Sequence, residues 1–473
     1  MKTMVQENKL NVCLHSDSID EALRKDKETT DVLLQCSELK EFNFIATPTN
    51  SSILSKLSSE IARISYEDKG NGCFVAHKQK KGIDQGWTGF HDVLPSSFFT
   101  DVFGYKEDSD EFQKIKNAFH DVLAFEAVSR FKDGNSLFVT QYFPLLKKNV
   151  WIQRKFNLKI LSFVQALEYM DLDLKRQNIY YINPKVKQTD GRAFHYWFLL
   201  RYLFPRFTEA WRVAVFGKAV IQNGAQIMDV LSGLADRLQN ALCASDRIAL
   251  EYMKHPINST EWEILYHFNY FCLLATGVFD ALAWLTVHRY SMPIGGVFDV
   301  SIHIKGSKSR GADFVKAISQ KNATLASFIQ KNQDLIKLFY PMRHSVQHRE
   351  PVGGTLFEDR TEGWTASLVR IKTDALTAIQ KIDTQRHPFS EWGLLNTFPD
   401  LLEPYRFTRK ALRELMVFSN EYLKSLDFPS LITSPELKKK IESASAKDPE
   451  TCFIAKVYWK RDSNLPILFR ASY

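Results

Sequence analysis

The feature that most constrains the fold is an apolar run over residues 268–287, in which Asp280 is the one charged side chain. As an α-helix, this run is long enough to cross a bilayer. A carboxylate at that depth costs about 2.5–3.5 kcal/mol on membrane-insertion scales, which disfavours a membrane span. We therefore expect a buried helix of a large helical domain. A membrane-associated scaffold built around the run is the alternative.

A second helix is predicted just before this run, because apolar side chains recur there with the period of an α-helix. They are Ile227, Leu231, Leu234, Leu238 and Leu242. The same periodicity predicts one helix over residues 313–340 and another over residues 406–426. Together these segments predict a mainly helical domain over residues 211–430.

The chain before this domain mixes both kinds of element. We expect a flexible lead-in over residues 1–35, because this segment is polar and rich in Asp, Lys, Ser and Thr. Over residues 36–210 we expect a mixed α/β domain, a candidate sensor or regulatory unit, with no catalytic constellation. Its strands are predicted at residues 42–45, 72–77, 137–143 and 179–182, and its helices at residues 53–64, 110–130 and 156–172. The predicted fold class is therefore α+β.

The helical domain is interrupted by an insertion at residues 352–403. The insertion is predicted to contain a strand at 364–372 and a short helix at 373–385, followed by a loop-rich segment at 388–404. A C-terminal extension of strand and helix follows over residues 431–473, and its β-prone segment 453–459 could pair with the N-terminal domain.

The motif that carries chemistry runs from Arg343 to His348, between Pro341 and Pro351. An arginine keeps its proton in a protein, whereas a histidine exchanges one near neutral pH. Together they can neutralise a phosphate and move a proton beside it, which suits phosphodiester cleavage. The two prolines predict a turn or short helix. On a regular helix, Arg343 and His348 would be five steps of about 100° apart, so that two facing copies would close a site better than one.

This motif resembles the active-site signature of the HEPN superfamily, which is Arg, then Asn, Asp or His, then three residues, then His. Arg343, His344 and His348 occupy its three positions, and the resemblance covers roughly residues 225–426. It implies a helical domain that dimerises and is often a metal-independent endoribonuclease, with a composite active site shared across the homodimer. In that family the RNA 2′-hydroxyl attacks the adjacent phosphate and leaves a 2′,3′-cyclic phosphate. The resemblance also implies a role in antiviral defence or in a toxin system, whereas the insertion at 352–403 departs from the family pattern.

The hypothesis gives each motif residue a role. His348 would be the general acid–base, Arg343 would stabilise charge on the phosphorane, and His344 would assist in positioning or proton transfer. Asp280 cannot be buried in its ionised form without a partner. We expect it to pair with Arg343 or to orient His348, and a nearby hydroxyl, amide or lysine is the alternative.

Basic residues on both sides of the motif helix are candidate contacts to an RNA backbone. They are Lys305, Lys308, Arg310 and Arg349. A plain solvated loop explains them without RNA. Likewise, the stretch 194–212 interleaves aromatic side chains with arginines, as in base-stacking surfaces, but helix packing is the favoured interpretation.

The overall composition fits this hypothesis without requiring it. There are 62 Lys and Arg against 54 Asp and Glu, a net charge of +8 that is compatible with RNA as a partner. The six cysteines are scattered, so we expect reduced thiols, no metal site and no cofactor. The first residues lack the apolar segment of a secretory signal, so we expect a cytoplasmic protein. The alternative function is a non-catalytic module that binds RNA or protein.

Overall fold

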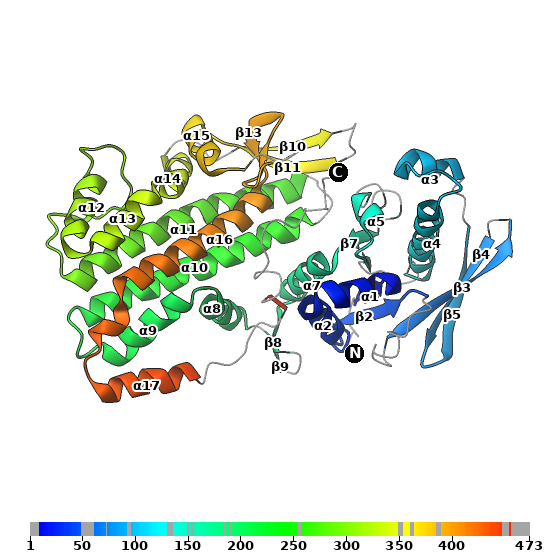
Figure 1. Cartoon of the computed structure of the whole chain (residues 1–473), viewed down its shortest axis with the longest axis horizontal. Helices are drawn as coiled ribbons and strands as arrows, with labels where there is room; N and C mark the ends of the chain where they lie inside the picture. Colours follow the sequence, from blue (N-terminus) through cyan, green and yellow to red (C-terminus); the bar gives the residue numbers. More distant parts are fainter. Residues whose placement is uncertain are drawn as a thin grey trace, which may run out of the picture. The chain divides into compact units, whose positions relative to one another are not determined.

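The computed structural model divides the chain into two compact units, each described here by itself (Figure 1). Unit 1 consists mainly of residues 1–189, and unit 2 of residues 190–358 and 365–452. The structure describes residues 9–48, 61–71, 73–91, 96–129, 136–148, 152, 156, 158–183, 186–189, 191–253, 258–348, 353–359, 364–384, 389–446 and 454–455. The boundary near residue 190 replaces the one predicted at 210, because the helices that follow residue 190 belong to unit 2.

Unit 1 is built on a seven-stranded sheet with the strand order β5-β4-β3-β2-β1-β6-β7. The strands are β1 (Leu10–Leu14), β2 (Phe42–Ala46), β3 (Ala62–Gly70), β4 (Cys73–Lys80), β5 (Ile83–His91), β6 (Ser136–Val139) and β7 (Lys159–Leu161). From β3 across to β7 neighbouring strands are parallel, while β4 and β5 add an antiparallel hairpin. A separate hairpin pairs β8 (Ile179–Asn183) with β9 (Val186–Thr189).

The prediction of a flexible lead-in over residues 1–35 is wrong for the described residues 9–35, because β1 is a central strand of this sheet. Every residue of β1 is buried, and the strand pairs with β2 on one side and β6 on the other. Two helices follow it at once, α1 (Ser16–Lys25) and α2 (Lys27–Cys36). A strand covered on both faces lacks the alternation of apolar and polar residues, and the five residues LNVCL are apolar apart from the buried Asn11.

Helices cover both faces of the sheet. On one face, α4 (Asp110–Ser129) packs on the four strands β3, β4, β5 and β6. Beside α4 lie α3 (Ser96–Phe103) and α5 (Phe143–Lys147). The side chains beneath α4 come from alternate strand positions, including Cys13, Ile45, Phe138 and Ile160. On the other face lies α7 (Phe163–Arg176), which contacts β6, β7 and α2.

Two helix predictions in unit 1 require correction. Within the helix predicted at 156–172, residues 159–161 form β7, and α7 begins only at Phe163. The start of α7 is set by Ser162, whose hydroxyl accepts from the Gln165 backbone while the Gln165 side chain accepts from the Ser162 backbone. Of the helix predicted at 53–64, Ile64 lies in β3 and residues 53–60 lie outside the described residues. The strands predicted near 42–45, 72–77 and 179–182, and the helix at 110–130, are confirmed.

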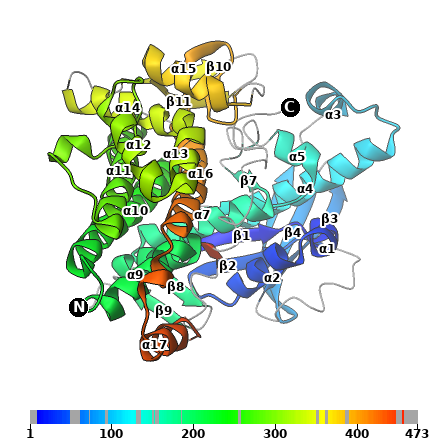
Figure 2. The ribbon, with the colours of Figure 1, turned by 60° about the vertical axis from the view of Figure 1, so that its left-hand side comes forward.

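Unit 2 is a helical bundle around α10 (Gly224–Tyr252), α11 (Asn258–Tyr290), α14 (Gln333–His348) and α16 (Pro404–Leu426). α10, α11 and α16 run alongside one another in both views (Figure 1, Figure 2). The apolar stripe of α10 faces inward as predicted, since Leu231, Leu234 and Leu238 have no exposed area. Among the described residues, α11 is long and apolar enough to cross a membrane, and 67% of its most apolar window is buried inside the molecule.

Two further helices precede the bundle in unit 2, α8 (Arg192–Leu203) and α9 (Pro205–Gly217). They contain the aromatic and arginine-rich stretch 194–212, whose side chains pack with one another. Trp197 and Trp211 meet edge to face with ring centroids 5.0 Å apart. Arg206 donates to Glu209 at 2.8 Å. These contacts support the packing interpretation of the stretch.

The single helix predicted at 313–340 is three helices, α12 (Arg310–Lys321), α13 (Ala323–Lys331) and α14. Asn322 ends the first and caps the second: its Oδ1 accepts from the Leu325 backbone N–H at 2.8 Å. Its Nδ2 donates to the Ser425 carbonyl at 2.8 Å and thereby ties the junction to α16. Asn322 therefore ends one helix and starts the next, while the apolar residues on either side keep the spacing of a single helix. This is why the sequence predicts one helix here.

The prolines predict a turn or a short helix that starts at Pro341, but the motif forms the end of α14, a helix of 16 residues. Pro341 stands within the helix, and the helical backbone continues to His348. A proline in a helix removes one N–H and crowds the preceding turn, but α14 keeps its apolar face buried, with Ile336, Phe339 and Met342 each at most 2% exposed. Packing of this face therefore outweighs the proline.

The insertion forms a four-stranded sheet with the order β10-β11-β13-β12. Its elements are β10 (Gly354–Asp359), β11 (Trp364–Arg370), α15 (Thr373–Ile382), β12 (Leu394–Leu395) and β13 (Phe398–Leu402). The predicted strand at 364–372 and helix at 373–385 are confirmed, whereas the segment predicted as loop contains β12 and β13. In the C-terminal extension α17 (Pro435–Ala446) is helical, and the strand predicted at 453–459 lies outside the described residues apart from 454–455, which are helical.

A buried ion pair joins α10 to α16 in unit 2. Arg409 donates to Asp246 at 3.0 Å, and both side chains are at most 8% exposed. Arg409→Ala would leave the Asp246 charge buried with fewer partners, so we expect it to lower the free energy of unfolding by about 3–5 kcal/mol in urea. The matched control is Arg206→Ala, which breaks a largely exposed pair with Glu209 and should cost less than about 1 kcal/mol. Equal losses in the two variants would contradict the prediction.

Candidate functional site

The helices of unit 2 bring two of the predicted site residues together. Arg343 on α14 donates from Nη1 to Oδ2 of Asp280 on α11 at 2.7 Å, which is the pairing expected from the apolar sequence around Asp280. Tyr340, one turn before Arg343, donates its hydroxyl to the other carboxylate oxygen at 2.9 Å. The side chains of Arg343 and Asp280 are 33% and 35% exposed, so the pair lies at the surface of the unit and not in its core.

His303, which was not singled out from the sequence, lies beside this pair. Its ring stacks on Tyr340 with centroids 4.1 Å apart and an interplanar angle of 18°. Burial, aided by the positive charges of Lys305 and Lys337, lowers the pKa of His303 to about 4. Burial and the Asp280 carboxylate raise the pKa of Tyr340. His303 is therefore a neutral ring at physiological pH, and it holds Tyr340 against the carboxylate.

The structure describes only some of the other predicted site residues. The His344 side chain is exposed. The side chain of His348, and Arg349 altogether, lie outside the described part of the structure, so the proposed acid–base group has a described backbone only. Lys305, Lys308 and Arg310 are exposed in the segment before α12 and at its start, and Arg310 lies 3.7 Å from Asp299. The structure thus joins Arg343 to Asp280 and leaves the basic residues on the surface.

A second polar site in unit 1 escaped the sequence analysis, which predicted no catalytic constellation there. It lies where the chain leaves β1 and β6, two neighbouring parallel strands. From β1 the chain passes to β2 on one side, and β6 lies on the other side. The gap between β1 and β6 is therefore the point where strand order reverses, and ligands of open α/β sheets bind outside the carboxyl ends of the strands at such points.

Alternation along the strands directs the polar side chains at this point toward one helix. His15, Thr47 and Thr140 each lie two positions beyond a strand residue that faces α4, and Asp121 lies on α4 itself. All four side chains are buried. Backbone bonds keep the ladder in register past the strand ends, with the His15 N–H donating to Val139 and the Thr140 N–H to Leu161, each at 2.9 Å.

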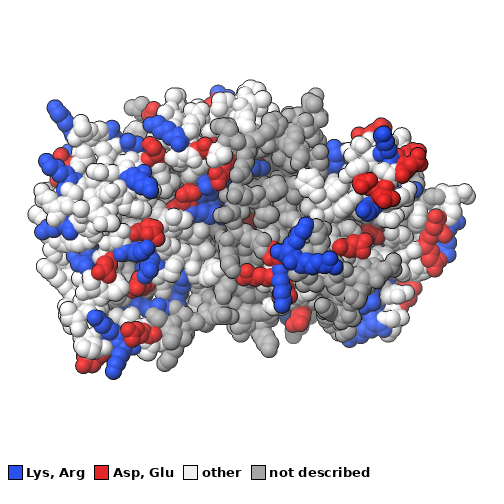
Figure 3. Space-filling model, viewed as in Figure 1, with Lys and Arg blue, Asp and Glu red and all other residues white. Residues whose placement is uncertain are grey.

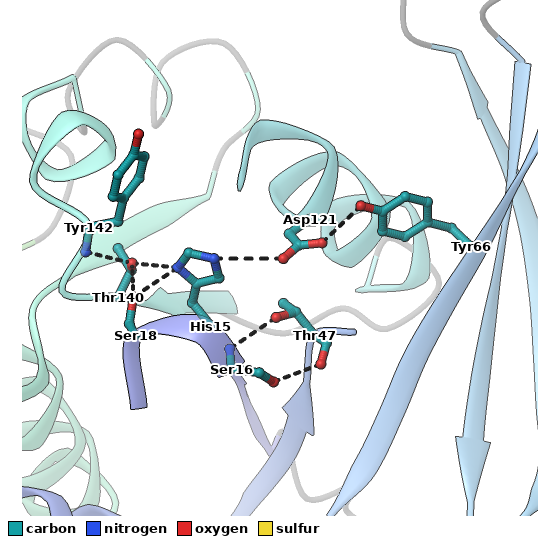
Figure 4. Close-up of polar contacts among 8 residues, drawn as sticks. All are labelled: His15, Ser16, Ser18, Thr47, Tyr66, Asp121, Thr140 and Tyr142. Atoms are coloured by element: carbon teal, nitrogen blue, oxygen red, sulfur yellow. Dashed lines mark hydrogen bonds and ion pairs between the residues drawn. The ribbon is translucent and has the colours of Figure 1, made fainter. Parts of the chain in front are cut away.

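His15 stands at the centre of a hydrogen-bonded cluster (Figure 4). Its Nδ1 lies 2.8 Å from the Thr140 hydroxyl and 2.9 Å from that of Ser18, and these two hydroxyls are 2.9 Å apart. On its other side, Nε2 faces the Asp121 carboxylate at 3.7 Å. Tyr66 donates its hydroxyl to that carboxylate at 3.1 Å. His15 and Asp121 therefore point toward one another across a gap longer than a hydrogen bond.

Both titratable groups of this cluster favour their neutral forms. Burial lowers the pKa of His15 to about 4, although the nearby Asp17 carboxylate acts in the opposite direction. Burial raises the pKa of Asp121 to about 7, and the hydrogen bonds from Tyr66 and Thr47 counteract only part of that effect. The two groups therefore do not form a salt bridge at neutral pH, because His15 carries no charge there.

Within the described residues, no group of three or more His, Cys, Asp or Glu side chains could hold a metal ion, and all five described cysteines are free. Charged side chains of both signs are interspersed on the face drawn in Figure 3, where the described residues can be seen. Comparison of the chain with family models, curated proteins and solved structures gives no match.

The raised pKa of Asp121 predicts a pH-dependent stability. The folded chain binds this proton more tightly than the unfolded chain, so the contribution to stability is complete below about pH 4 and lost as pH rises through about 7. Asp121→Asn lacks this contribution. Between about pH 4 and about pH 7, the free energy of unfolding of the unmodified chain should therefore fall relative to that of the variant, by at most about 4 kcal/mol.

The measurement is urea unfolding of the intact chain and the variant at several pH values. His15 has the opposite pH dependence, because its lowered pKa stabilises the folded chain above about pH 6.5 and less as pH falls toward 4. To first order this effect cancels, because both proteins contain His15. Asp101→Asn, the same change at an exposed carboxyl of α3, is the control and should show no trend. A difference independent of pH in Asp121→Asn would show that the carboxyl is not protonated preferentially on folding.

Proposed function

We propose that the chain is a metal-independent endoribonuclease of the HEPN type, active as a homodimer on RNA. The observation that carries the proposal is the contact of 2.7 Å between Arg343 and Asp280 at the surface of the helical unit. It supports the hypothesis because it joins the arginine of the motif to the one charged residue of the apolar run. A cytoplasmic role in antiviral defence or in a toxin system is part of the proposal.

The pair with Asp280 would give Arg343 a fixed orientation. A guanidinium carries five N–H donors in a rigid fork and can bind more than one acceptor at once. Asp280 accepts from Nη1 and is itself held by Tyr340, which stacks on His303. A preorganised cation loses little free energy to reorganisation when charge develops on a phosphate. Asp280 is thus proposed as a positioning residue for Arg343.

The proposed reaction is the attack of the RNA 2′-hydroxyl on the adjacent phosphorus. A base takes the hydroxyl proton, the new O–P bond forms, and the bond to the 5′-oxygen of the next nucleotide breaks. That oxygen receives a proton, leaving a 2′,3′-cyclic phosphate and a 5′-hydroxyl. His348 would transfer these protons, Arg343 would stabilise the phosphorane charge, and His344 would assist in positioning.

The geometry of α14 favours a site made by two chains. Arg343 and His348 lie on one continuous helix, five residues apart. Five steps of about 100° place the two positions on different faces of the helix, so one copy of the helix does not bring them together over one phosphate. In a symmetric dimer, the arginine of one protomer can face the histidine of the other. Lys305, Lys308, Arg310 and Arg349 would then extend the contact with the RNA backbone.

A specific observation favours the second candidate function, a non-catalytic module that binds RNA or protein. The charge of Arg343 is already balanced by Asp280, so the pair could serve to dock α14 on α11 without any chemistry. The two candidate functions differ in what happens to the RNA. A binding module retains RNA, whereas the enzyme leaves ends with a cyclic phosphate.

The first test is cleavage of total RNA by the purified chain in EDTA. His348→Ala should lower the rate at least about 100-fold, because it removes the proton-transfer group. Arg343→Ala should lower it by about 100-fold or more, because it removes the charge that stabilises the phosphorane. The matched controls His288→Ala and Arg206→Ala change a partly exposed histidine and an exposed arginine of the same unit, and should retain the activity. Unimpaired cleavage by His348→Ala would exclude the assignment, and absence of cleavage by the unmodified chain would favour the binding module.

The second test asks whether the site is shared between protomers. When Arg343→Ala and His348→Ala chains are mixed and allowed to exchange, half of the dimers contain one chain of each kind. Each mixed dimer has one site with both substitutions and one intact site, so the mixture should recover about a quarter of the unmodified activity. A site within one chain predicts no recovery at all. Light scattering of each variant confirms that the dimer is intact before mixing.

A further inference from the structure

A cavity of about 420 Å³ opens at the point in unit 1 where the strand order reverses. Its volume lies in the range of small-molecule sites, about 300–1,000 Å³. It is lined by His15, Asp17, Ser18, Lys114, Asn117, Ala118, Asp121 and Tyr142. These residues come from the segment that follows β1, from α4 and from the segment that follows β6. The cavity therefore combines the fold position and the size of a ligand site.

The inner part of the cavity is buried and polar. His15, Ser18 and Asp121 are each at most 6% exposed. The ring of His15 is fixed by Thr140 and Ser18 on its Nδ1 side, so that Nε2 faces Asp121. The 3.7 Å gap between Nε2 and the Asp121 carboxylate can be bridged by a polar atom that bonds to both.

The outer part of the cavity supplies one aromatic wall and few positive charges. Tyr142 is half-buried, and its ring meets that of His15 at an angle of 67° with centroids 6.4 Å apart. Asp17, Lys114 and Asn117 are exposed at the rim. At the rim the Asp17 carboxylate balances the one ammonium group, so the lining offers no excess of positive charge to a phosphorylated ligand.

We propose that this cavity binds an uncharged nucleoside, with its base against Tyr142 and its hydroxyl or amino groups donating to Asp121 and Asp17. The fold position, the volume, the aromatic wall and the buried acceptor Asp121 each fit such a molecule. Asp121 lies on α4 and Asp17 in the first turn of α1, and carboxylate oxygens there can accept from ribose hydroxyls, which donate in pairs. The proposal concerns unit 1 alone and does not rest on the function proposed for unit 2.

A hydrolase triad is the rival explanation for Ser18, His15 and Asp121. A serine nucleophile needs a histidine that is itself oriented by donating a hydrogen bond to the third group. At 3.7 Å from Nε2, Asp121 does not make that bond. Moreover, the Ser18 hydroxyl is 2.9 Å from Thr140 as well as from His15. The cluster is thus better arranged to hold a ligand than to activate a nucleophile.

The test is titration calorimetry of the full chain with adenosine, guanosine, cytidine and uridine, and with their 5′-monophosphates. We expect saturable binding of at least one nucleoside at millimolar concentration or below, and weaker binding of its monophosphate. Asn117→Phe places a bulky ring at the rim and should abolish this binding. Gln113→Phe, the same addition one turn earlier on α4 at an exposed position that does not line the cavity, should leave it unchanged.

Asp121→Asn keeps the size of the side chain and removes an ionisable acceptor, so it should weaken binding by about tenfold or more. It provides the test if Asn117→Phe fails to fold, which circular dichroism will show. The proposal is overturned if none of the four nucleosides binds, if the monophosphates bind more tightly than the nucleosides, or if a folded Asn117→Phe or Asp121→Asn chain binds as the unmodified chain does.

Discussion

The orientation of the motif arginine in unit 2 depends on one carboxylate in an apolar helix. α11 supplies much of the core of the bundle, and an ionised side chain on such a helix is destabilising unless another group compensates its charge. Asp280 obtains that compensation from α14, through the guanidinium of Arg343 and the hydroxyl of Tyr340. The pair is partly exposed and contributes little to the free energy of unfolding, so its effect is to orient the motif arginine. Apolar contacts such as that of Phe279 with Phe339 hold α14 on α11.

Unit 1 resolves a similar problem in another way. Asp121 has no basic side chain bonded to it among the contacts of its cluster, and its neighbours are His15, Tyr66 and Thr47. Burial shifts both Asp121 and His15 toward their neutral forms. A neutral cluster can accept or donate hydrogen bonds without the cost of burying a charge. The same residue type thus serves an electrostatic purpose in one unit and a hydrogen-bonding purpose in the other.

These two sites also differ in how far the sequence reveals them. The partner of Asp280 was predictable, because a charge within an apolar run requires a partner of opposite charge and the motif that follows along the chain contains Arg343. The cluster of unit 1 was not, because His15 and Thr140 are 125 residues apart and belong to no common motif. Only the strand order brings them together. The signal in the sequence is a polar residue directly after each of two short apolar runs, at His15 and Thr140, and the polar surroundings of the first run conceal it.

The same comparison explains which elements were predictable. Helices with one buried face, such as α10 and α16, show their period directly in the sequence. β1 is buried on both faces and has no period to detect. Capping by Asn322 and packing around Pro341 are decided by side chains distant in sequence, including Ser425 on α16. Elements with one solvent-exposed face can therefore be predicted from the local sequence. Fully buried elements can be predicted only once the long-range contacts of the fold are known. The buried residues at the base of the unit 1 cavity belong to this second group.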